Sequence, residues 1–363
     1  MRVLITAPNL DTNKNVSGIS TVVNTIIENN PKHTYFHYLL GRPDKVQGFV
    51  YLFVFIKQLL YFPVVLRREK IDLVHQNLPF DPKGLMRESI INFWCYIFKV
   101  PVLLHVHGGE FLMNENPKKL WQYLSSVLFK HSRQVLVLSE LEKEALTQFH
   151  GFDSSIVLSN SIAVEKYMYE ERSTFNAKAV FLFLGRLHES KGLKDIYEAF
   201  VQLKSKSLKF RFILCGSGPL EQYCVESFEK LLGEEFDFRG VVSGADKLKV
   251  FREADFFLLP SRYGEGLPMA LLEAMASGLV PIVTDDASMK FVVTPFVNGV
   301  RVNKRDGKDI AEKITQLLGR PCAVRKFQAE AIRTVREAYD IGSYILKLNE
   351  VYEDNLSKGR SHP

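Results

Sequence analysis

Short apolar runs alternate along the chain with longer stretches of helical periodicity. The runs in the first part of the chain are VLITA (3–7), IDLVH (71–75), VLLHVH (102–107), VLVLS (135–139) and IVLSN (156–160). Those in the second part are AVFLFLG (179–185), FRFILCG (210–216), FDFRG (236–240), DFFLLP (255–260), VPIVTD (280–285) and NGVRV (298–302). Such runs, apolar on both faces, are typical of parallel strands covered by helices. The alternation predicts an α/β fold built from doubly wound units.

The runs fall into two sets, and each set is large enough for a sheet of its own. Between them lies a polar stretch without strand character, SIAVEKYMYEERSTFNA (161–177). A chain of 363 residues also exceeds the usual size of a single core. We therefore predict two Rossmann-like domains, residues 1–165 and 166–335, followed by a last helix and tail over 336–363.

One apolar stretch, residues 49–70, has about the length of a membrane span. Lys57 and Gln58 lie in its middle and Pro63 interrupts it, which disfavours a span and favours a partly buried or interface helix. Its basic flank would suit an anionic membrane surface. The alternative is a core helix with a solvated basic end.

Composition and charge narrow the class of protein. The net charge of +6 is small for this length and gives no reason to expect a nucleic-acid partner. The four cysteines lack metal-ligand spacing and are too few for a disulfide framework, so a reducing compartment fits. The start, MRVLITAPNL, reads as a first strand and lacks the apolar core of a signal peptide. We expect a cytoplasmic protein.

The stretch SRYGEGLPMALLEAMASGLVPIVTDD (261–286) carries the first candidate chemistry. Pro268 suits a helix start and Gly278 a helix end, and the residues between them offer no polar face except Glu273. A buried carboxylate needs donors. They would be either a cation of the same core or adjacent hydroxyls of a ligand such as a ribose. Glu265 precedes the helix in a glycine-rich loop, where a ligand anion could dock on the helix N-terminus; alternatively Glu265 only complements the helix dipole.

A second cluster, FLFLGRLHESKGL (181–193), places Arg186 and Lys191 after a predicted strand, in a loop punctuated by glycine. Two cations at the carboxyl end of a strand suit a diphosphate. The alternative is a solvated loop with ordinary surface charges.

Three further turns follow predicted strands. Gly216 lies in CGSGPL (215–220) and Gly18 in NVSGIS (15–20), each a weak indication of close approach to a phosphate. His107 ends a strand in HVHGGE (105–110), and it is interpreted as a hydrogen-bonding or proton-handling residue, with a structural histidine as the alternative. No metal site is expected, since no carboxylate or cysteine completes a ligand set.

Together these motifs resemble the retaining nucleotide-sugar glycosyltransferases of family 4, which have the GT-B fold of two Rossmann-like domains facing each other across a cleft. The resemblance rests on EGLPMALLE, with Glu265 and Glu273 in an E-x7-E arrangement, and on GRLHESKGL. The GSGP turn, the HVHG element, SNSIAVEKY and VNGVRV are also similar to that family.

The resemblance implies a role for each candidate residue. Arg186 and Lys191 would bind the donor diphosphate, and Glu273 the ribose hydroxyls. The donor sugar and phosphate would meet Glu265, Gly266, Leu267 and Pro268. Val242 would lie near the base and His107 beside the transferred sugar. Gly18 would face the phosphate from the first domain, and Gly216 would be a substrate-binding residue of the GSGP turn.

The function implied is transfer of a hexose-type sugar, with retention, from a nucleoside-diphosphate sugar to a glycan or lipid-linked acceptor in cell-surface polysaccharide synthesis. No cofactor and no metal are expected. The enzyme would act in the cytoplasm or peripherally on the inner face of the cytoplasmic membrane. Two alternatives remain: a nucleotide-sugar epimerase or hydrolase of the same fold, and a non-catalytic nucleotide-sugar-binding protein.

Overall fold

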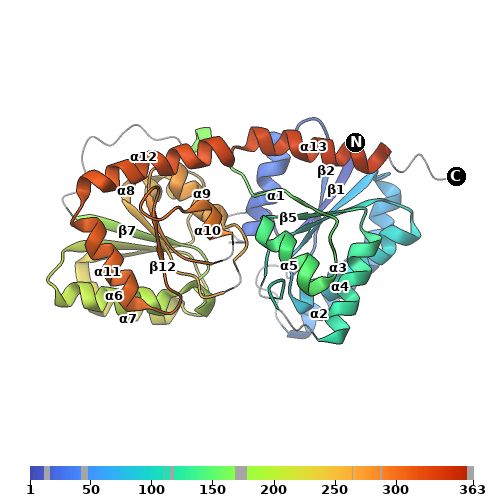
Figure 1. The fold of residues 1–363 in the computed structure, drawn as a ribbon. Coiled ribbons are helices and arrows are strands. Elements are labelled where there is room, and N and C mark those ends of the chain that lie inside the picture. The colour runs from blue at the N-terminus through green and yellow to red at the C-terminus, as the bar shows by residue number, and fades with distance from the viewer. Residues whose placement is uncertain are drawn as a thin grey trace. The chain divides into compact units, whose positions relative to one another are not determined.

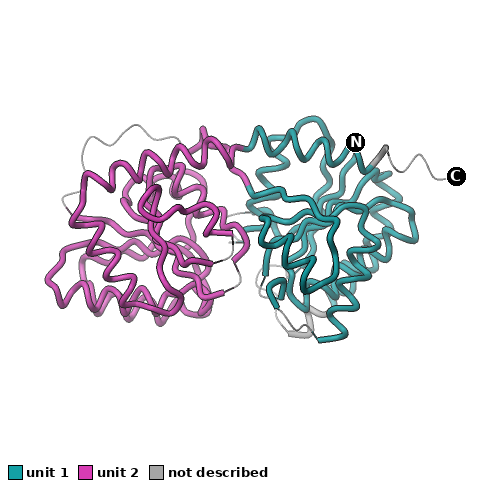
Figure 2. Tube along the Cα trace, in the orientation of Figure 1, with its two compact units in different colours: residues 1–160, 341–363 teal, residues 161–340 magenta. Residues whose placement is uncertain are grey.

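The computed structural model describes residues 1–11, 17–41, 48–109, 111–114, 118–167, 178–263, 265–286 and 288–357. The chain divides into two compact units, residues 1–160 with 341–363 (unit 1) and residues 161–340 (unit 2), shown in Figure 2. The sequence places the boundaries at residues 165 and 335 instead. Ile162 explains the position of the division, because its N–H donates to Tyr339 O within unit 2, tying the two ends of that unit together.

Unit 1 is a six-stranded parallel sheet in the order β2-β1-β3-β4-β5-β6 (Figure 1). Its strands are β1 (Arg2–Ala7), β2 (Thr34–Leu39), β3 (Leu73–Leu78), β4 (Val102–Val106), β5 (Gln134–Val137) and β6 (Ser155–Val157). Its helices are α1 (Gly18–Asn29), α2 (Gly48–Arg68), α3 (Pro82–Ile97), α4 (Lys119–His131), α5 (Glu140–His150) and α13 (Ile341–Ser357). Helices α1 and α13 pack together, while α2, α3 and α4 pack side by side on the other face of the sheet.

Unit 2 is a second six-stranded parallel sheet, in the order β12-β11-β10-β7-β8-β9. Its strands are β7 (Ala179–Leu184), β8 (Phe210–Cys215), β9 (Phe236–Gly240), β10 (Phe256–Leu259), β11 (Val280–Thr284) and β12 (Val300–Val302). Its helices are α6 (Leu193–Ser205), α7 (Glu221–Leu232), α8 (Gly244–Glu253), α9 (Met269–Ala276), α10 (Met289–Val292), α11 (Gly307–Leu318) and α12 (Pro321–Ala338). Three short 3₁₀ turns are η1 (Val164–Lys166), η2 (Glu189–Lys191) and η3 (Gly233–Glu235).

The cores follow from the apolar runs. In unit 2, Phe200 of α6 packs on Phe210 and Phe212 of β8, with ring centroids 4.7 and 5.0 Å apart. These rings are fully buried, and burying such a side chain contributes about 1.5–3 kcal/mol. Every strand predicted from a continuous apolar run is present, and β2 is the strand that these runs do not include.

The apolar helix predicted after Pro268 is confirmed as α9, whose residues are buried except Ala270. Gly278, at φ +77°, follows the helix end. The stretch 49–70 forms α2, and in the described part of the chain no helix is both long enough and apolar enough to cross a membrane.

Candidate active site

The candidate residues of unit 2 lie at the carboxyl edge of its sheet. The first strand, β7, has β8 on one side and β10 on the other, so the chain reverses its direction of winding between β7 and β10. Ligands of doubly wound sheets bind outside the carboxyl ends of the strands at such a point. The loops that leave these two strands, 185–192 and 260–268, carry Arg186, Lys191 and Glu265. Gly264 lies outside the described residues.

The two loops touch through their backbones. Gly192 is left-handed at φ +72°, and a Cβ there would lie 2.0 Å from Pro260 O. The N–H of Arg262 donates to Ser190 O at 2.7 Å. Only glycine permits this approach, which brings the end of η2 against the loop after β10.

Lys191 and Glu265 meet where the loops cross. The Lys191 ammonium forms an ion pair with Glu265 Oε1, and Ser261 Oγ donates to the same oxygen at 2.6 Å. The carboxylate is 7% exposed and the lysine side chain 22%. Both of these contacts are to Oε1, and no described residue donates to Glu265 Oε2. The partly exposed Lys191 ammonium and this second carboxylate oxygen therefore remain available to a ligand.

Arg262 holds the loop that carries Lys191. Its guanidinium donates to both oxygens of Asp195, at 2.9 and 2.6 Å, and to Glu189 Oε1 at 2.7 Å. Asp195 is in the first turn of α6 and its side chain is 2% exposed. The fork therefore ties η2 and α6 to the loop after β10.

We expect Arg262→Ala to lower the free energy of unfolding by about 2–4 kcal/mol, because it leaves the buried Asp195 carboxylate without its cation. Urea unfolding of the full chain measures the effect. Arg333→Ala is the matched control: the Arg333 side chain is 62% exposed and pairs with Glu330 within α12, and its loss should cost less than about 1 kcal/mol. Equal losses in the two variants would contradict the role given to Arg262.

Glu273 lies on α9 with its side chain 3% exposed. Its Oε1 accepts from Lys247 Nζ at 2.7 Å and from Tyr167 Oη at 2.8 Å. The sequence allowed either a cation of the same core or a ligand ribose as the partner of Glu273. Lys247, from α8 of the same unit, is such a cation. Both donors use Oε1, and none of the described side chains or amides donates to Oε2.

The other candidates of unit 2 differ in what surrounds them. Arg186 is exposed on the loop after β7. Gly216 has φ +134°, and a Cβ there would lie 1.8 Å from Gly185 O, while its own N–H donates to Gly240 O at 2.6 Å. Gly216 therefore allows the loops after β7, β8 and β9 to meet, and its amide is already used. Val242 is half-buried between β9 and α8.

The three residues before α9, 266–268, connect the loop to the start of the helix. Leu267 is buried, whereas Gly266 and Pro268 are half-buried. Pro268 is the N-cap residue, and its carbonyl accepts from Leu271 and Leu272. The first N–H groups of a helix have no intrahelical acceptor, which leaves the start of α9 suited to an anion.

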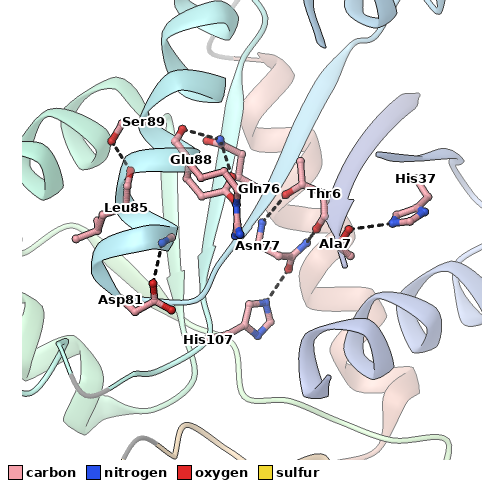
Figure 3. A network of polar contacts seen from close by, with 12 residues as sticks. Thr6, Ala7, His37, Gln76, Asn77, Asp81, Leu85, Glu88, Ser89 and His107 are labelled. Carbon is pink, nitrogen blue, oxygen red and sulfur yellow. Dashed lines mark hydrogen bonds and ion pairs between the residues drawn. The ribbon is translucent and has the colours of Figure 1, made fainter. Parts of the chain in front are cut away.

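In unit 1, His107 follows β4 at the carboxyl edge of the sheet (Figure 3). Its Nε2 lies 2.6 Å from Asn77 Oδ1, while the Asn77 amide donates to Thr6 O at 2.9 Å. Because Oδ1 only accepts, the imidazole proton is on Nε2. Burial lowers the pKa of His107, so the ring is neutral at pH 7 and Nδ1 is an acceptor.

Behind His107 lies a buried polar chain that ends on α13. The ring of His105 is 4.1 Å from that of His107, and His105 Nδ1 is 3.4 Å from His75 Nε2. His75 Nδ1 in turn is hydrogen-bonded to Tyr352 Oη at 2.7 Å. Burial lowers the pKa of His75 to about 3, so this chain is uncharged.

Gly18 begins α1, and a Cβ there would meet nothing within 4 Å. Gly18 differs from Gly216 in this respect, because no described neighbour would contact a Cβ at position 18. Gly18 and His107 belong to unit 1, and the remaining candidates belong to unit 2.

Sequence reasoning missed the residues that hold the candidates in place: Ser261, Arg262, Lys247, Tyr167 and Asn77. Ser261 and Arg262 lie directly after β10, which was a signal that could have been used. Lys247 and Tyr167 come from elements distant in sequence from Glu273, and no local pattern pairs them with it.

Comparison with known proteins finds a family match for part of the chain. Residues 169–336 match the family described as Glycosyl transferases group 1. It is 25% identical over 290 residues to the N,N'-diacetylbacillosaminyl-diphospho-undecaprenol alpha-1,3-N-acetylgalactosaminyltransferase of Campylobacter jejuni, over 73% of each chain. It is 32% identical over 247 residues to WcaL of Escherichia coli, a protein named for colanic acid biosynthesis, over 65% of this chain and 59% of WcaL.

Among solved structures, HepE of Anabaena in complex with UDP-glucose matches with a TM-score of 0.77 and 16% identity, over 98% of this chain and 100% of HepE. This likeness confirms the predicted fold class, an α/β chain of two Rossmann-like units as in the GT-B glycosyltransferases.

Proposed function

We propose, starting from the match to the Glycosyl transferases group 1 family, that the protein is a retaining glycosyltransferase. It moves a hexose-type sugar from a nucleoside-diphosphate sugar to a glycan or lipid-linked acceptor in cell-surface polysaccharide synthesis. The observation that carries the proposal is the meeting of Lys191, Glu265 and the start of α9 at the point where the winding of the unit 2 sheet reverses. The names of the C. jejuni and E. coli relatives support the polysaccharide and the lipid-linked acceptor.

The donor diphosphate is assigned to Arg186, Lys191 and the N–H groups at the start of α9. As the bond from the sugar C1 to the diphosphate oxygen breaks, the leaving group gains negative charge. Fixed positive groups at that position stabilise the charge in the transition state. We infer that no metal is required, since these groups are themselves cationic or positively polarised.

The nucleoside and the sugar are assigned to the groups that retain an open acceptor. Glu273 Oε2 accepts from the ribose hydroxyls, and Glu265 Oε2 from hydroxyls of the donor sugar. Val242 lies toward the base, and Gly266, Leu267 and Pro268 line the sugar and phosphate. In unit 1, Gly18 is assigned to a phosphate and His107 Nδ1 to a hydroxyl of the transferred sugar.

Retention is assigned to attack on the face that the leaving group departs from, as the E-x7-E resemblance to family 4 implies. The acceptor oxygen bonds to C1 while the C1–O bond to the diphosphate breaks. The acceptor proton passes to a phosphate oxygen of the leaving group. Glu265 is held by Lys191 and Ser261 and acts here as a hydrogen-bond acceptor.

Calorimetric titration with UDP, GDP and ADP, repeated in EDTA, tests the donor site. We expect micromolar binding of one nucleotide, unchanged by EDTA. The matching nucleotide sugar should then be consumed only when an acceptor is present. Consumption without an acceptor would indicate the epimerase or hydrolase, and binding without any turnover would indicate the non-catalytic protein. A folded protein that binds none of the three nucleotides would contradict the proposal.

A further inference from the structure

Three neighbouring helices of unit 1 present apolar side chains to the outside. Of the 21 large apolar side chains exposed among the described residues, twelve lie on α2, α3 and α4. An exposed apolar surface of this extent on a folded domain normally marks an interaction site.

Helix α2 carries the longest stripe. Phe53, Ile56, Leu60 and Val64 recur at helical spacing and are exposed, Phe53 by 71% and Leu60 by 64%. The opposite stripe of the helix, which includes Leu59, Phe62 and Leu66, is buried in the core. A hollow of about 350 Å³ runs along the outer stripe. The outward face therefore carries a row of large apolar side chains of its own, which folding of the chain alone does not require.

Helix α3 continues this surface. Met86, Ile90, Phe93 and Ile97 form its exposed stripe. The guanidinium of Arg67, at the end of α2, lies 4.6 Å from the ring centroid of Phe98, just past α3. The two apolar stripes are thus neighbours, and α4 adds Leu120 and Tyr123 beyond them.

The charges on the three helices are mostly positive, although Arg68 at the end of α2 pairs with the next residue, Glu69, at 2.7 Å. The sequences of α2, α3 and α4 hold seven lysines and arginines and a single acidic residue, Glu88, which is buried. Lys57 lies within the α2 stripe and Arg67 and Arg68 at its end, all exposed. Long basic side chains can lay their stems along an apolar surface while the charge reaches outward.

We propose that the outer faces of α2, α3 and α4 form a docking surface for an anionic lipid membrane. The apolar stripes enter the boundary between headgroups and acyl chains, and the cations contact lipid phosphates. A second copy of this chain fits less well, because a symmetric contact would place the same cations opposite one another. The purpose given to this surface rests on the proposed function: membrane binding would hold the enzyme where a lipid-linked acceptor lies.

Its position within unit 1 agrees with that purpose. Helix α3 begins at Pro82, four residues after β3 ends at Leu78, and His107 N–H donates to Leu78 O at 2.9 Å. The start of the apolar surface and the candidate sugar-binding histidine therefore lie at the same edge of the unit 1 sheet.

Intrinsic fluorescence gives a direct test, because the chain has two tryptophans, Trp94 on α3 and Trp121 on α4. We expect phosphatidylglycerol vesicles containing brominated acyl chains to quench this fluorescence, and pure phosphatidylcholine vesicles to do so far less. Flotation with the same vesicles measures the bound fraction. If the protein neither floats nor is quenched at low salt, the proposal is wrong.

Two matched pairs of variants locate the surface. Leu60→Asp should abolish binding, whereas Leu346→Asp on α13, where the leucine is 68% exposed, should leave it unchanged. Lys57→Glu should weaken binding about tenfold or more, and Lys308→Glu on unit 2 should not. Unchanged binding by Leu60→Asp, or a salt-independent dimer that this variant dissociates in the absence of lipid, would overturn the membrane assignment.

The membrane surface and the proposed function can fail separately. Nucleotide binding by Leu60→Asp should equal that of the unmodified protein, because Leu60 is in unit 1, on the outer face of α2, and is not assigned to the donor. A protein that binds vesicles as expected but no nucleotide would keep the docking surface and lose the transferase assignment. A protein that binds a nucleotide but no vesicles would keep the transferase assignment and lose the docking surface.

Discussion

Replacing Lys191 with alanine is expected to lower kcat/KM about ten- to a hundredfold while the protein remains folded. The Lys191 side chain is 22% exposed, and its ammonium pairs with Glu265 Oε1. If Lys191 binds the donor diphosphate as proposed, its replacement removes a charged hydrogen-bond partner, which costs about 1.5–3 kcal/mol. Calorimetry should then show a similar loss of nucleotide affinity, because the nucleotide keeps the diphosphate to which Lys191 is assigned.

Lys194→Ala is the matched control for Lys191→Ala. Lys194 lies three residues further along, is 42% exposed, and pairs with Glu189 at 3.0 Å. An exposed pair of this kind contributes little, so activity and affinity should change less than about twofold. Full activity in a folded Lys191→Ala variant would remove Lys191 from the donor site.

Replacing Glu273 with glutamine is expected to weaken binding of the preferred nucleotide about tenfold or more. The Glu273 side chain is only 3% exposed, yet no described group donates a hydrogen bond to its Oε2. This oxygen can therefore accept from a ligand. If this oxygen accepts from the ribose, the unmodified protein should also prefer the ribonucleotide over its 2′-deoxy form. The preference should shrink in Glu273→Gln. Titration of both proteins with both nucleotides measures it.

The purely structural alternative for Glu273 predicts a different pattern. If the carboxylate only neutralises Lys247 and fixes Tyr167, Glu273→Gln should lower the thermal unfolding midpoint and leave the preference for the ribonucleotide unchanged. Glu235→Gln serves as a control for loss of a carboxylate, since Glu235 is also in unit 2 and forms an ion pair with Lys178. An unchanged preference in Glu273→Gln would contradict the assignment to ribose.

Most of the fold was predictable because buried parallel strands carry a continuous apolar signal. The exception is β2, TYFHYL, an edge strand paired only with β1 in the sheet order. Five of its six side chains are exposed or half-buried, and polar residues are mixed with aromatic ones, so it gives no apolar run. Helix α9 was predicted correctly because Pro268, Gly278 and the lack of a polar face are all local features.

The candidate site was only partly predictable. Lys191 and Glu265 stood out because each follows a strand that ends at the same edge of the sheet, and the structure brings them into direct contact. Lys247 did not stand out, because it is one of two lysines in α8 and nothing in the local sequence indicates its partner. Whether a buried carboxylate such as Glu273 has a protein cation depends on packing between α8 and α9, which is a tertiary property.

The last helix also determines the order in which the chain can fold during synthesis. Unit 1 needs α13: Asn349 Oδ1 accepts from Asn30 at 2.8 Å, and Tyr352 Oη is hydrogen-bonded to the buried His75. These partners leave the ribosome only after all of unit 2 has been made. During synthesis, unit 1 therefore remains without α13 until unit 2 has been made. A chain truncated near its end would contain a complete unit 2 and a unit 1 that lacks its last helix.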